Sequence, residues 1–249
     1  MSTSEMSTSV TSAAAAASTT ASAAASTTAS ATAPATATAT QGAAPAVAAA
    51  PSRAVSMTIN GQAVGPFQVP ETLMLIDYLH EYAGLTGSRL GCGQGICHAC
   101  VVILDQPDGT SVEMRSCITG AAYFQGKKIR TIEGHAQRNA AGEVTALSPV
   151  QQKFLEFYSF QCGYCTPGFV NAATVLLERL ARQPIAKDQV ESVVTQALDS
   201  HICRCTGYVR YHRAVRDLVL STPGLTKDGG QDKLKQDVAV ESKESGHGK

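Results

Sequence analysis

Residues 90–100 read LGCGQGICHAC, and this run holds three cysteines, Cys92, Cys97 and Cys100. A fourth, Cys117, follows after sixteen residues, so the full pattern is C-x4-C-x2-C-x16-C. Glycines recur around Cys92, and glycine lets a backbone bend tightly enough to bring N–H groups close to sulfur. The stretch therefore predicts a loop that wraps around a small group held by thiolates.

This cysteine spacing is typical of plant-type ferredoxins, which bind a [2Fe–2S] cluster. Two iron ions need four thiolates that converge on one small object, here three from one loop and the fourth from a strand end beyond it. Backbone N–H groups directed at the sulfurs raise the reduction potential, because they stabilise the added electron. The first quartet therefore predicts one [2Fe–2S] cluster.

A second quartet, Cys162, Cys165, Cys203 and Cys205, has the pattern C-x2-C-x37-C-x-C. Each pair falls in a gap between two expected helices, so the four thiolates can meet at one end of a helix bundle. A C-x-C pair is tight for tetrahedral zinc but suits neighbouring ligands of a cluster. This quartet predicts a second cluster.

Other uses of the eight cysteines stay open on these residues alone. Four disulfides are common in short secreted chains, whereas this chain has 249 residues and no basic, apolar leader. Structural zinc would also take four thiolates per site, and the second quartet suits zinc better than the glycine-rich first loop does. A zinc-stapled interaction module is therefore one alternative, and a free-standing ferredoxin-like carrier is another.

Residues 53–134 have the pattern of a small α+β domain. Val55, Met57 and Ile59 alternate with polar residues before Asn60-Gly61, a strong hairpin signal. The expected elements are a hairpin over 55–69, a helix over 75–82, a second hairpin over 101–114 that turns at 107–109, and a last short strand over 129–132.

Residues 148–223 change to a helical period. Ser148 is the expected N-cap of a first helix and Pro149 its first residue, and Asp188 is the expected cap of a third. Four short amphipathic helices predict a small bundle. Their apolar positions fall within 150–158, 169–180, 190–198 and 214–219.

The remaining segments have few large apolar side chains to bury. We expect residues 1–52 to be a disordered tail rich in Ala, Ser and Thr, residues 135–147 to be a linker, and residues 224–249 to be a polar tail.

Charge and hydropathy exclude two classes of function. Twenty basic and twenty acidic residues leave no net charge, so we expect no nucleic-acid partner. No run approaches the roughly 18 apolar residues that a membrane helix needs, so we expect no membrane span. Cysteines not used in disulfides and the lack of a clear signal favour the cytoplasm, with the periplasm as the alternative.

Three motifs together resemble the iron–sulfur subunit of the molybdenum hydroxylases, the xanthine dehydrogenase and aldehyde oxidase family. The motifs are LTGSRLGCGQGICHACVVILD at 85–105, QCGYCTPGFV at 161–170 and HICRCTGYVRY at 201–211. The resemblance covers nearly all of residues 55–220. It implies an N-terminal β-grasp ferredoxin-like domain followed by an all-α four-helix-bundle domain, each with one [2Fe–2S] cluster held by its four cysteines.

The resemblance also implies partners and roles. A separate large chain would hold a molybdopterin cofactor and hydroxylate an aldehyde or N-heterocycle. Gln161 and Cys205 match positions that lie close to the pterin, so the bundle cluster would be the inner one. The chain lacks a dinucleotide fingerprint and a haem-attachment motif, so a flavin subunit or a cytochrome would accept the electrons. We expect this chain itself to be non-catalytic.

Two positions depart from the family pattern. His98 stands where the family usually has glycine, and Ser200-His201 replaces its usual Gly-Asn. His98 either adjusts the cluster's potential, contacts an electron acceptor, or is a solvent-facing loop residue. For His201 we favour simple structural variation.

Overall fold

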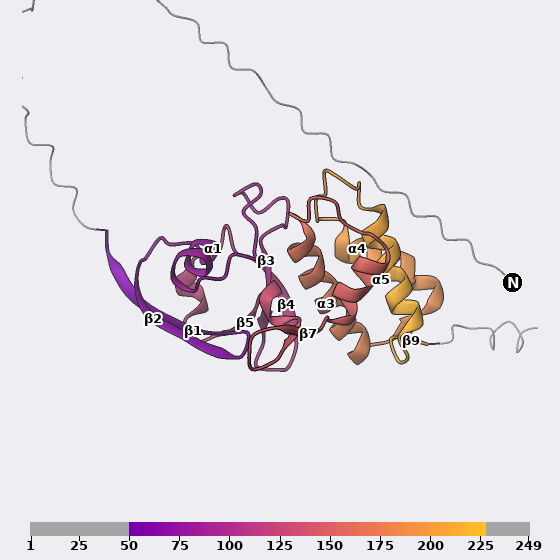
Figure 1. The fold of residues 1–249 in the computed structure, drawn as a ribbon, viewed down its shortest axis with the longest axis horizontal. Helices are drawn as coiled ribbons and strands as arrows, with labels where there is room; N and C mark the ends of the chain where they lie inside the picture. Colours follow the sequence, from indigo (N-terminus) through magenta and orange to yellow (C-terminus); the bar gives the residue numbers. More distant parts are fainter. Residues whose placement is uncertain (1–49, 228–249) are drawn as a thin grey trace, which may run out of the picture. The chain divides into compact units, whose positions relative to one another are not determined.

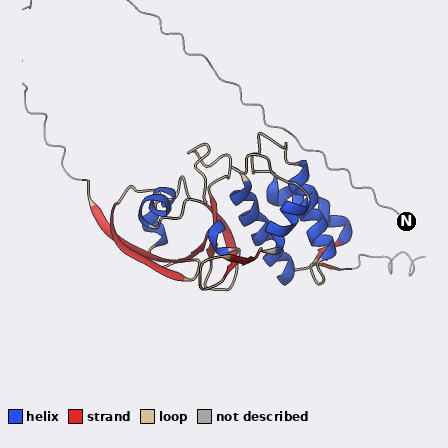
Figure 2. Cartoon of the chain, viewed as in Figure 1, coloured by secondary structure: helices blue, strands red, loops and turns tan. Residues whose placement is uncertain are grey.

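The computed structural model describes residues 50–227, which comprise a sheet with short helices and a set of longer helices (Figures 1 and 2). The expected tails at 1–52 and 224–249 lie almost entirely outside the described residues. Within the described range, no helix has both the length and the apolar character needed to cross a bilayer.

The sheet domain is built on five strands in the order β2-β1-β5-β3-β4. β1 and β5 run parallel, and the other neighbouring strands run antiparallel. This is the β-grasp arrangement that the resemblance implied. The strands are β1 (Ser52–Ile59), β2 (Gln62–Pro70), β3 (Val101–Asp105), β4 (Ser111–Arg115) and β5 (Lys128–Arg130).

Both expected hairpins are confirmed. Asn60 and Gly61 have φ values of 52° and 81°, and two positive φ values in a two-residue turn match the twist of antiparallel strands. In the second hairpin Gly109 has a φ of 80°, and Asp108 accepts hydrogen bonds from Thr110. The turns therefore form where the sequence placed them.

The helix across the sheet differs from a regular α-helix. Only α1 (Leu75–Asp77) is α-helical, and η1 (Tyr78–Tyr82) continues it as a π-helix in which Ala83 N–H donates to Tyr78 C=O. Ile132, expected in the last strand, lies in the 3-10 helix η3 (Ile132–Gly134), because β5 ends at Arg130. A further 3-10 helix, η2, spans Ala121–Phe124.

The segment expected as a linker pairs with itself. β6 (Gln137–Arg138) and β7 (Val144–Ala146) form an antiparallel hairpin. The Asn139 side-chain oxygen accepts hydrogen bonds from the N–H groups of Ala141 and Glu143, which closes the turn.

Four helices form the helical domain, as expected. Ser148 caps the first through a capping box with Gln151, whereas Tyr158 lies beyond its end and is 75% exposed. The prediction for Asp188 is wrong, because the residue before the third helix is Gln189 and Asp188 lies in the 3-10 helix η4 (Lys187–Gln189). The helices are α2 (Pro149–Glu156), α3 (Thr166–Arg182), α4 (Val190–Leu198) and α5 (Val209–Ser221).

An aromatic group anchors the helical core. The rings of Phe169 on α3 and Tyr211 on α5 stack with centroids 4.0 Å apart, and Phe154 on α2 meets Tyr211 edge-on at 4.9 Å. All three side chains are buried, so one cluster joins three helices. A short parallel bridge between β8 (Ile185–Ala186) and β9 (Thr226–Lys227) closes the domain.

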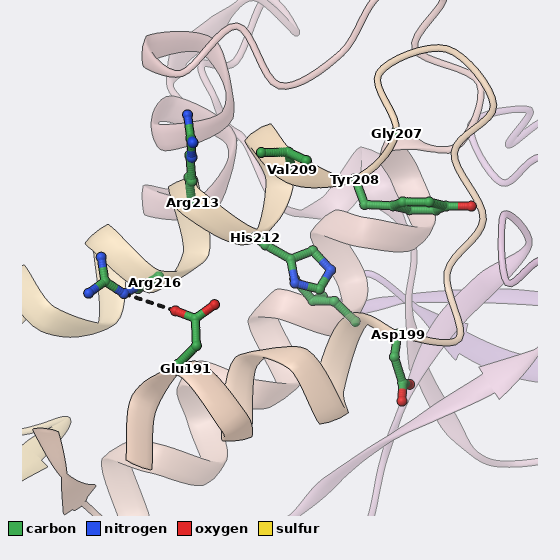
Figure 3. Close-up of a pocket in the computed structure, with 9 residues that line it drawn as sticks. Glu191, Asp199, Gly207, Tyr208, Val209, His212, Arg213 and Arg216 are labelled. Carbon is green, nitrogen blue, oxygen red and sulfur yellow. Dashed lines mark ion pairs between the residues drawn. The ribbon is translucent and has the colours of Figure 1, made fainter. Parts of the chain in front are cut away.

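A cavity of about 480 Å³ opens beside α4 and α5 (Figure 3), and no sequence pattern indicated it. Glu191 on α4 pairs with Arg216 on α5 at 3.0 Å across one side of it, and His212 and Asp199 also line it. None of the eight cysteines borders this cavity, so it is separate from the two quartets.

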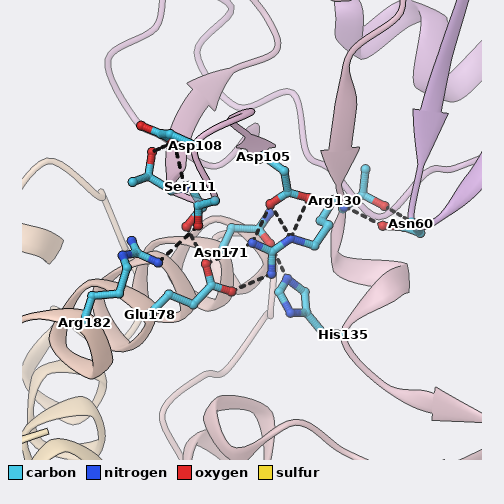
Figure 4. A network of polar contacts seen from close by, with 12 residues as sticks. Asn60, Asp105, Asp108, Ser111, Arg130, His135, Asn171, Glu178 and Arg182 are labelled. Atoms are coloured by element: carbon cyan, nitrogen blue, oxygen red, sulfur yellow. Dashed lines mark hydrogen bonds and ion pairs between the residues drawn. The ribbon is translucent and has the colours of Figure 1, made fainter.

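A polar network holds the two domains together where α3 packs against β3 and β4 (Figure 4). Arg130 on β5 pairs with Asp105 at 2.8 Å and with Glu178 on α3 at 2.7 Å. Asn171 Nδ2 on α3 donates to Val101 C=O on β3 at 2.6 Å. Because these bonds tie α3 to two strands, they fix the position of one domain against the other.

Neutralising Glu178 should weaken this contact. Burial raises the pKa of the Glu178 carboxyl, but hydrogen bonds from Arg130 and Ser111 outweigh burial and hold that pKa below its usual value. A depressed pKa stabilises the folded state above the unfolded-state pKa, and this stabilisation is lost as the pH falls through the folded-state pKa. We expect Glu178→Gln to lower Tm by about 2–4 °C at pH 7, for a loss of about 1 kcal/mol.

Calorimetry of the cluster-loaded chain is done at pH 7, because acid destroys [2Fe–2S] clusters. Glu81→Gln, at an exposed position in the sheet domain, serves as the control and should leave Tm unchanged. An unchanged Tm for Glu178→Gln at pH 7 would show that the network does not stabilise the fold.

Candidate metal centres

The first cysteine loop curls around Cys92. Its Sγ accepts hydrogen bonds from the N–H groups of Gln94, Ile96 and Cys97, at 3.3–3.4 Å. These bonds, led by that from Cys97, lower the pKa of the Cys92 thiol to about 6. Cys92 therefore ionises readily to the thiolate, the form in which cysteine binds metal.

Glycine is required at two places in this loop. A Cβ on Gly91 would lie 2.8 Å from the Cys97 sulfur, and one on Gly95, where φ is +71°, would lie 2.5 Å from the Ile118 side chain. A Cβ at Gly91 would displace the Cys97 sulfur, and a side chain at Gly95 would strain a backbone conformation that favours glycine. The glycines that the sequence singled out thus let the backbone approach the ligands closely.

Cys100 and Cys117 complete this quartet from the sheet. Cys100 directly precedes β3, and Cys117 lies two residues beyond β4. Both are buried, and burial raises the pKa of the Cys100 thiol to about 11. Ser116 N–H and Oγ both donate to Cys100 C=O, at 3.4 and 2.7 Å. The end of β4 is thereby held beside the start of β3.

The second quartet comes from two turns between helices. Cys162 and Cys165 lie between α2 and α3, and Cys203 and Cys205 lie between α4 and α5. The structure brings the two turns together, with 3.4 Å between the Cys162 and Cys205 sulfurs. Those two thiols are exposed, whereas Cys165 and Cys203 are buried.

Neighbouring groups set the protonation of the buried pair. Burial raises the pKa of Cys203, but hydrogen bonds from the Thr206 hydroxyl and N–H outweigh it and lower the pKa to about 7. Burial raises the pKa of Cys165 to about 12, and the Tyr211 hydroxyl lies 3.6 Å from its sulfur. One thiol of the pair thus ionises readily, and the other needs a bound metal to do so.

The two quartets open onto one cavity of about 320 Å³. Ile202 N–H donates to Cys97 C=O at 3.1 Å, and the Tyr164 hydroxyl donates to Leu90 C=O at 2.8 Å, so the loops of the two domains touch. All eight cysteines are free thiols, and the disulfide alternative is wrong. The sulfurs lining the cavity belong to Cys92, Cys97, Cys162, Cys165, Cys203 and Cys205.

Gln161 lies at the exposed edge of the second quartet. Its side chain is exposed, as are those of Cys162 and Cys205. The two residues expected next to a pterin, Gln161 and Cys205, are thus both open to a partner.

The two unusual histidines, His98 and His201, meet in the structure. Their ring centroids lie 5.0 Å apart in an edge-on contact. His201 is only 1% exposed, and the Nδ1 atom of His98 is buried. His98 Nδ1 therefore does not face solvent, contrary to one of the three interpretations of this residue. No sequence pattern indicated that His98 and His201 lie in contact.

The thiol chemistry agrees with known families. Residues 57–122, which contain the first quartet, match the family described as "2Fe-2S iron-sulfur cluster binding domain". Residues 131–216, which contain the second, match the one described as "[2Fe-2S] binding domain". The chain therefore has two [2Fe–2S]-binding domains, and the zinc alternative is wrong.

Two relatives that match most of their own length are named as subunits of oxidoreductases. The chain is 40% identical to the nicotine 6-hydroxylase small subunit of Paenarthrobacter nicotinovorans over 150 residues, or 60% of this chain and 78% of that protein. It is 37% identical to the xanthine dehydrogenase iron-sulfur-binding subunit of Escherichia coli O157:H7 over 166 residues, or 66% of this chain and 92% of that protein.

A solved structure gives the same assignment. Quinoline 2-oxidoreductase from Pseudomonas putida 86 aligns with a TM-score of 0.55 and 33% identity, over 70% of this chain and 93% of that one. The chain spans only 10–11% of the much longer xanthine dehydrogenase and aldehyde oxidase chains that it also matches. It belongs to the [2Fe–2S] small subunits of the molybdenum hydroxylase family, the iron–sulfur electron-transfer subunits of these oxidoreductase complexes.

Proposed function

We propose that this chain relays single electrons from the molybdenum centre of a large partner chain to an acceptor on another chain. The observation that carries the proposal is the convergence of two thiol quartets on one cavity, which six of the eight sulfurs line. A bound [2Fe–2S] cluster supplies one-electron uptake and release. The protein's role is to hold two such clusters close together and to protect them from solvent.

We propose all eight cysteines as the ligands. In the sheet domain, three N–H groups directed at Cys92 favour added negative charge on that sulfur. In the helical domain, Thr206 does the same for Cys203 through its hydroxyl and its N–H, at 3.0 and 3.4 Å. Each quartet therefore combines sulfurs that accept hydrogen bonds with sulfurs buried against the core.

The exposed edge of the second quartet is the proposed contact with the large chain. Cys162 and Cys205 are exposed there beside Gln161, and the amide of Gln161 offers both a donor and acceptors to a pterin ring. This makes the helical-domain quartet the inner one and the Cys92 quartet the outer one.

The outer quartet is the proposed exit toward a flavin subunit or a cytochrome. Ile96 and Ile118, which lie in the cluster loop and next to Cys117, are 59% and 46% exposed. Apolar side chains beside a redox centre suit a transient contact with another protein. Each quartet thus has its own exposed contact surface, one for the large chain and one for the electron acceptor.

The large chain is the proposed site of chemistry on an aldehyde or N-heterocycle. Three similar proteins are named for nicotine, xanthine and quinoline. We place the complex in the cytoplasm, because eight cysteines with no disulfide among them suit a reducing compartment.

Single cysteine variants should remove the clusters one at a time. Cys117→Ser should leave only the helical-domain cluster, and Cys203→Ser only the sheet-domain cluster, because each loses one of four ligands. Iron should fall from four to two per chain in both variants. Each should lack a different paramagnetic signal after reduction with dithionite, so the two variants act as controls for each other. Loss of both signals in both variants would contradict two independent quartets.

Replacing Gln161 should weaken assembly without harming the clusters. We expect Gln161→Leu to bind the large chain about tenfold less tightly, for the loss of one hydrogen-bonding group, with iron content unchanged. Gln94→Leu, in the outer loop, is the matched control. Equal affinity of Gln161→Leu and parent would place the contact elsewhere.

The chain alone should not oxidise substrate. Purified cluster-loaded protein should show no turnover of aldehydes or N-heterocycles with an artificial electron acceptor, and addition of the large chain should restore it. Turnover by the isolated chain would contradict the relay role.

A further inference from the structure

Three potential metal ligands meet at the junction of the two domains, apart from the thiols. His98 lies in the first cysteine loop, Glu113 on β4, and His201 in the turn after α4. One ligand atom from each lies within 4.8 Å of the other two. His201 Nε2 is 3.6 Å from Glu113 Oε2, which is too long for a direct hydrogen bond.

These side chains lack the partners that buried polar groups normally have. Neither ring nitrogen of His201 makes a hydrogen bond of good geometry, although the Gly168 backbone lies close enough to act on the ring, and Nδ1 of His98 is also buried and unpaired. Unpaired buried polar atoms destabilise a fold and are rare. The three side chains are therefore placed to bind a group that is not part of the protein chain.

The three ligands border a cavity of about 280 Å³, which Gln196, Ser200 and Arg179 also line. Two imidazoles and one carboxylate are a recurrent ligand set for divalent zinc and iron, and this set leaves coordination positions open. The cavity gives those positions room for water.

We propose that His98, Glu113 and His201 form a third metal site, which binds a divalent first-row transition ion such as Zn²⁺. Ligand atoms about 2.1 Å from zinc lie about 3.4 Å apart in a tetrahedron. The His201–Glu113 separation of 3.6 Å is close to this value. No separation among the three ligand atoms exceeds 4.8 Å, and side-chain rotations that move an atom by about 1 Å close the remaining distance.

The charges around the site decide which ions can bind. Arg115 and Arg179 both act on Glu113 and disfavour any cation, whereas Asp199 acts on His98 in the opposite direction. One carboxylate against two guanidinium groups is too little for Mg²⁺ or Ca²⁺, which need several oxygen ligands. Strong bonds to two imidazoles make zinc the better match.

Such an ion would join the two cysteine loops. His98 directly follows Cys97, and His201 stands two residues before Cys203. The site would therefore hold the loops of the two quartets at a constant separation. It would also explain why both departures from the family pattern occur in this one chain and touch each other.

Zinc binding to the cluster-loaded chain tests the proposal. After dialysis against a chelator, with iron and sulfide measured before and after, equilibrium dialysis with Zn²⁺ should give one zinc per chain beyond the cluster iron. His201→Asn, His98→Gly and Glu113→Gln should each lower the affinity by at least about 100-fold, because lost outer-shell partners alone cost up to that much. His212→Asn, on α5, should bind zinc as the parent does.

Three results would overturn the proposal. The first is a parent chain with intact clusters that takes up no zinc, and the second is a Glu113→Gln variant that binds zinc as tightly as the parent. The third is sulfur in the zinc shell by X-ray absorption, which would assign the ion to the thiols. Glu113→Gln keeps the shape of its side chain on a part-exposed strand, so it tests the site even where a histidine variant does not fold.

Discussion

In the proposed account four sulfurs converge on one small group in each domain, and the local structure agrees with this constraint. In the sheet domain, Gly91 and Gly95 stand where any Cβ would strike a neighbour, so the loop can turn its N–H groups toward Cys92. In the helical domain, the turns before α3 and α5 supply two cysteines each. The stacked rings of Phe169 and Tyr211 hold those two helices together.

The contact between α3 and the sheet extends this constraint from one quartet to the other. Cys165 directly precedes α3, and Asn171 on that helix binds the carbonyl of Val101, the residue after Cys100. Farther along, Glu178 pairs with Arg130. Electron transfer between two centres depends on their separation. Here the first turns of α3 hold Cys165 of one quartet close to Cys100 of the other, through the bond from Asn171 to Val101.

Local patterns in the sequence were enough for the hairpin at Asn60-Gly61 and the capped start of α2, because each depends on neighbours in the chain. The π-helical turn at Tyr78–Tyr82 and the hairpin over 137–146 were missed, since tertiary packing and self-pairing decide them. The contacts of His98 with His201 and of Arg130 with Glu178 join residues 103 and 48 positions apart, and no single sequence reveals such pairs.

The central claim is that two quartets of thiolates each hold a pair of iron ions. Iron and acid-labile sulfide analysis of anaerobically purified chain, together with paramagnetic resonance after dithionite reduction, tests it most directly. Two clusters of two iron ions require four irons and four sulfides per chain and two distinct rhombic signals. A colourless protein with no such signals would contradict the account.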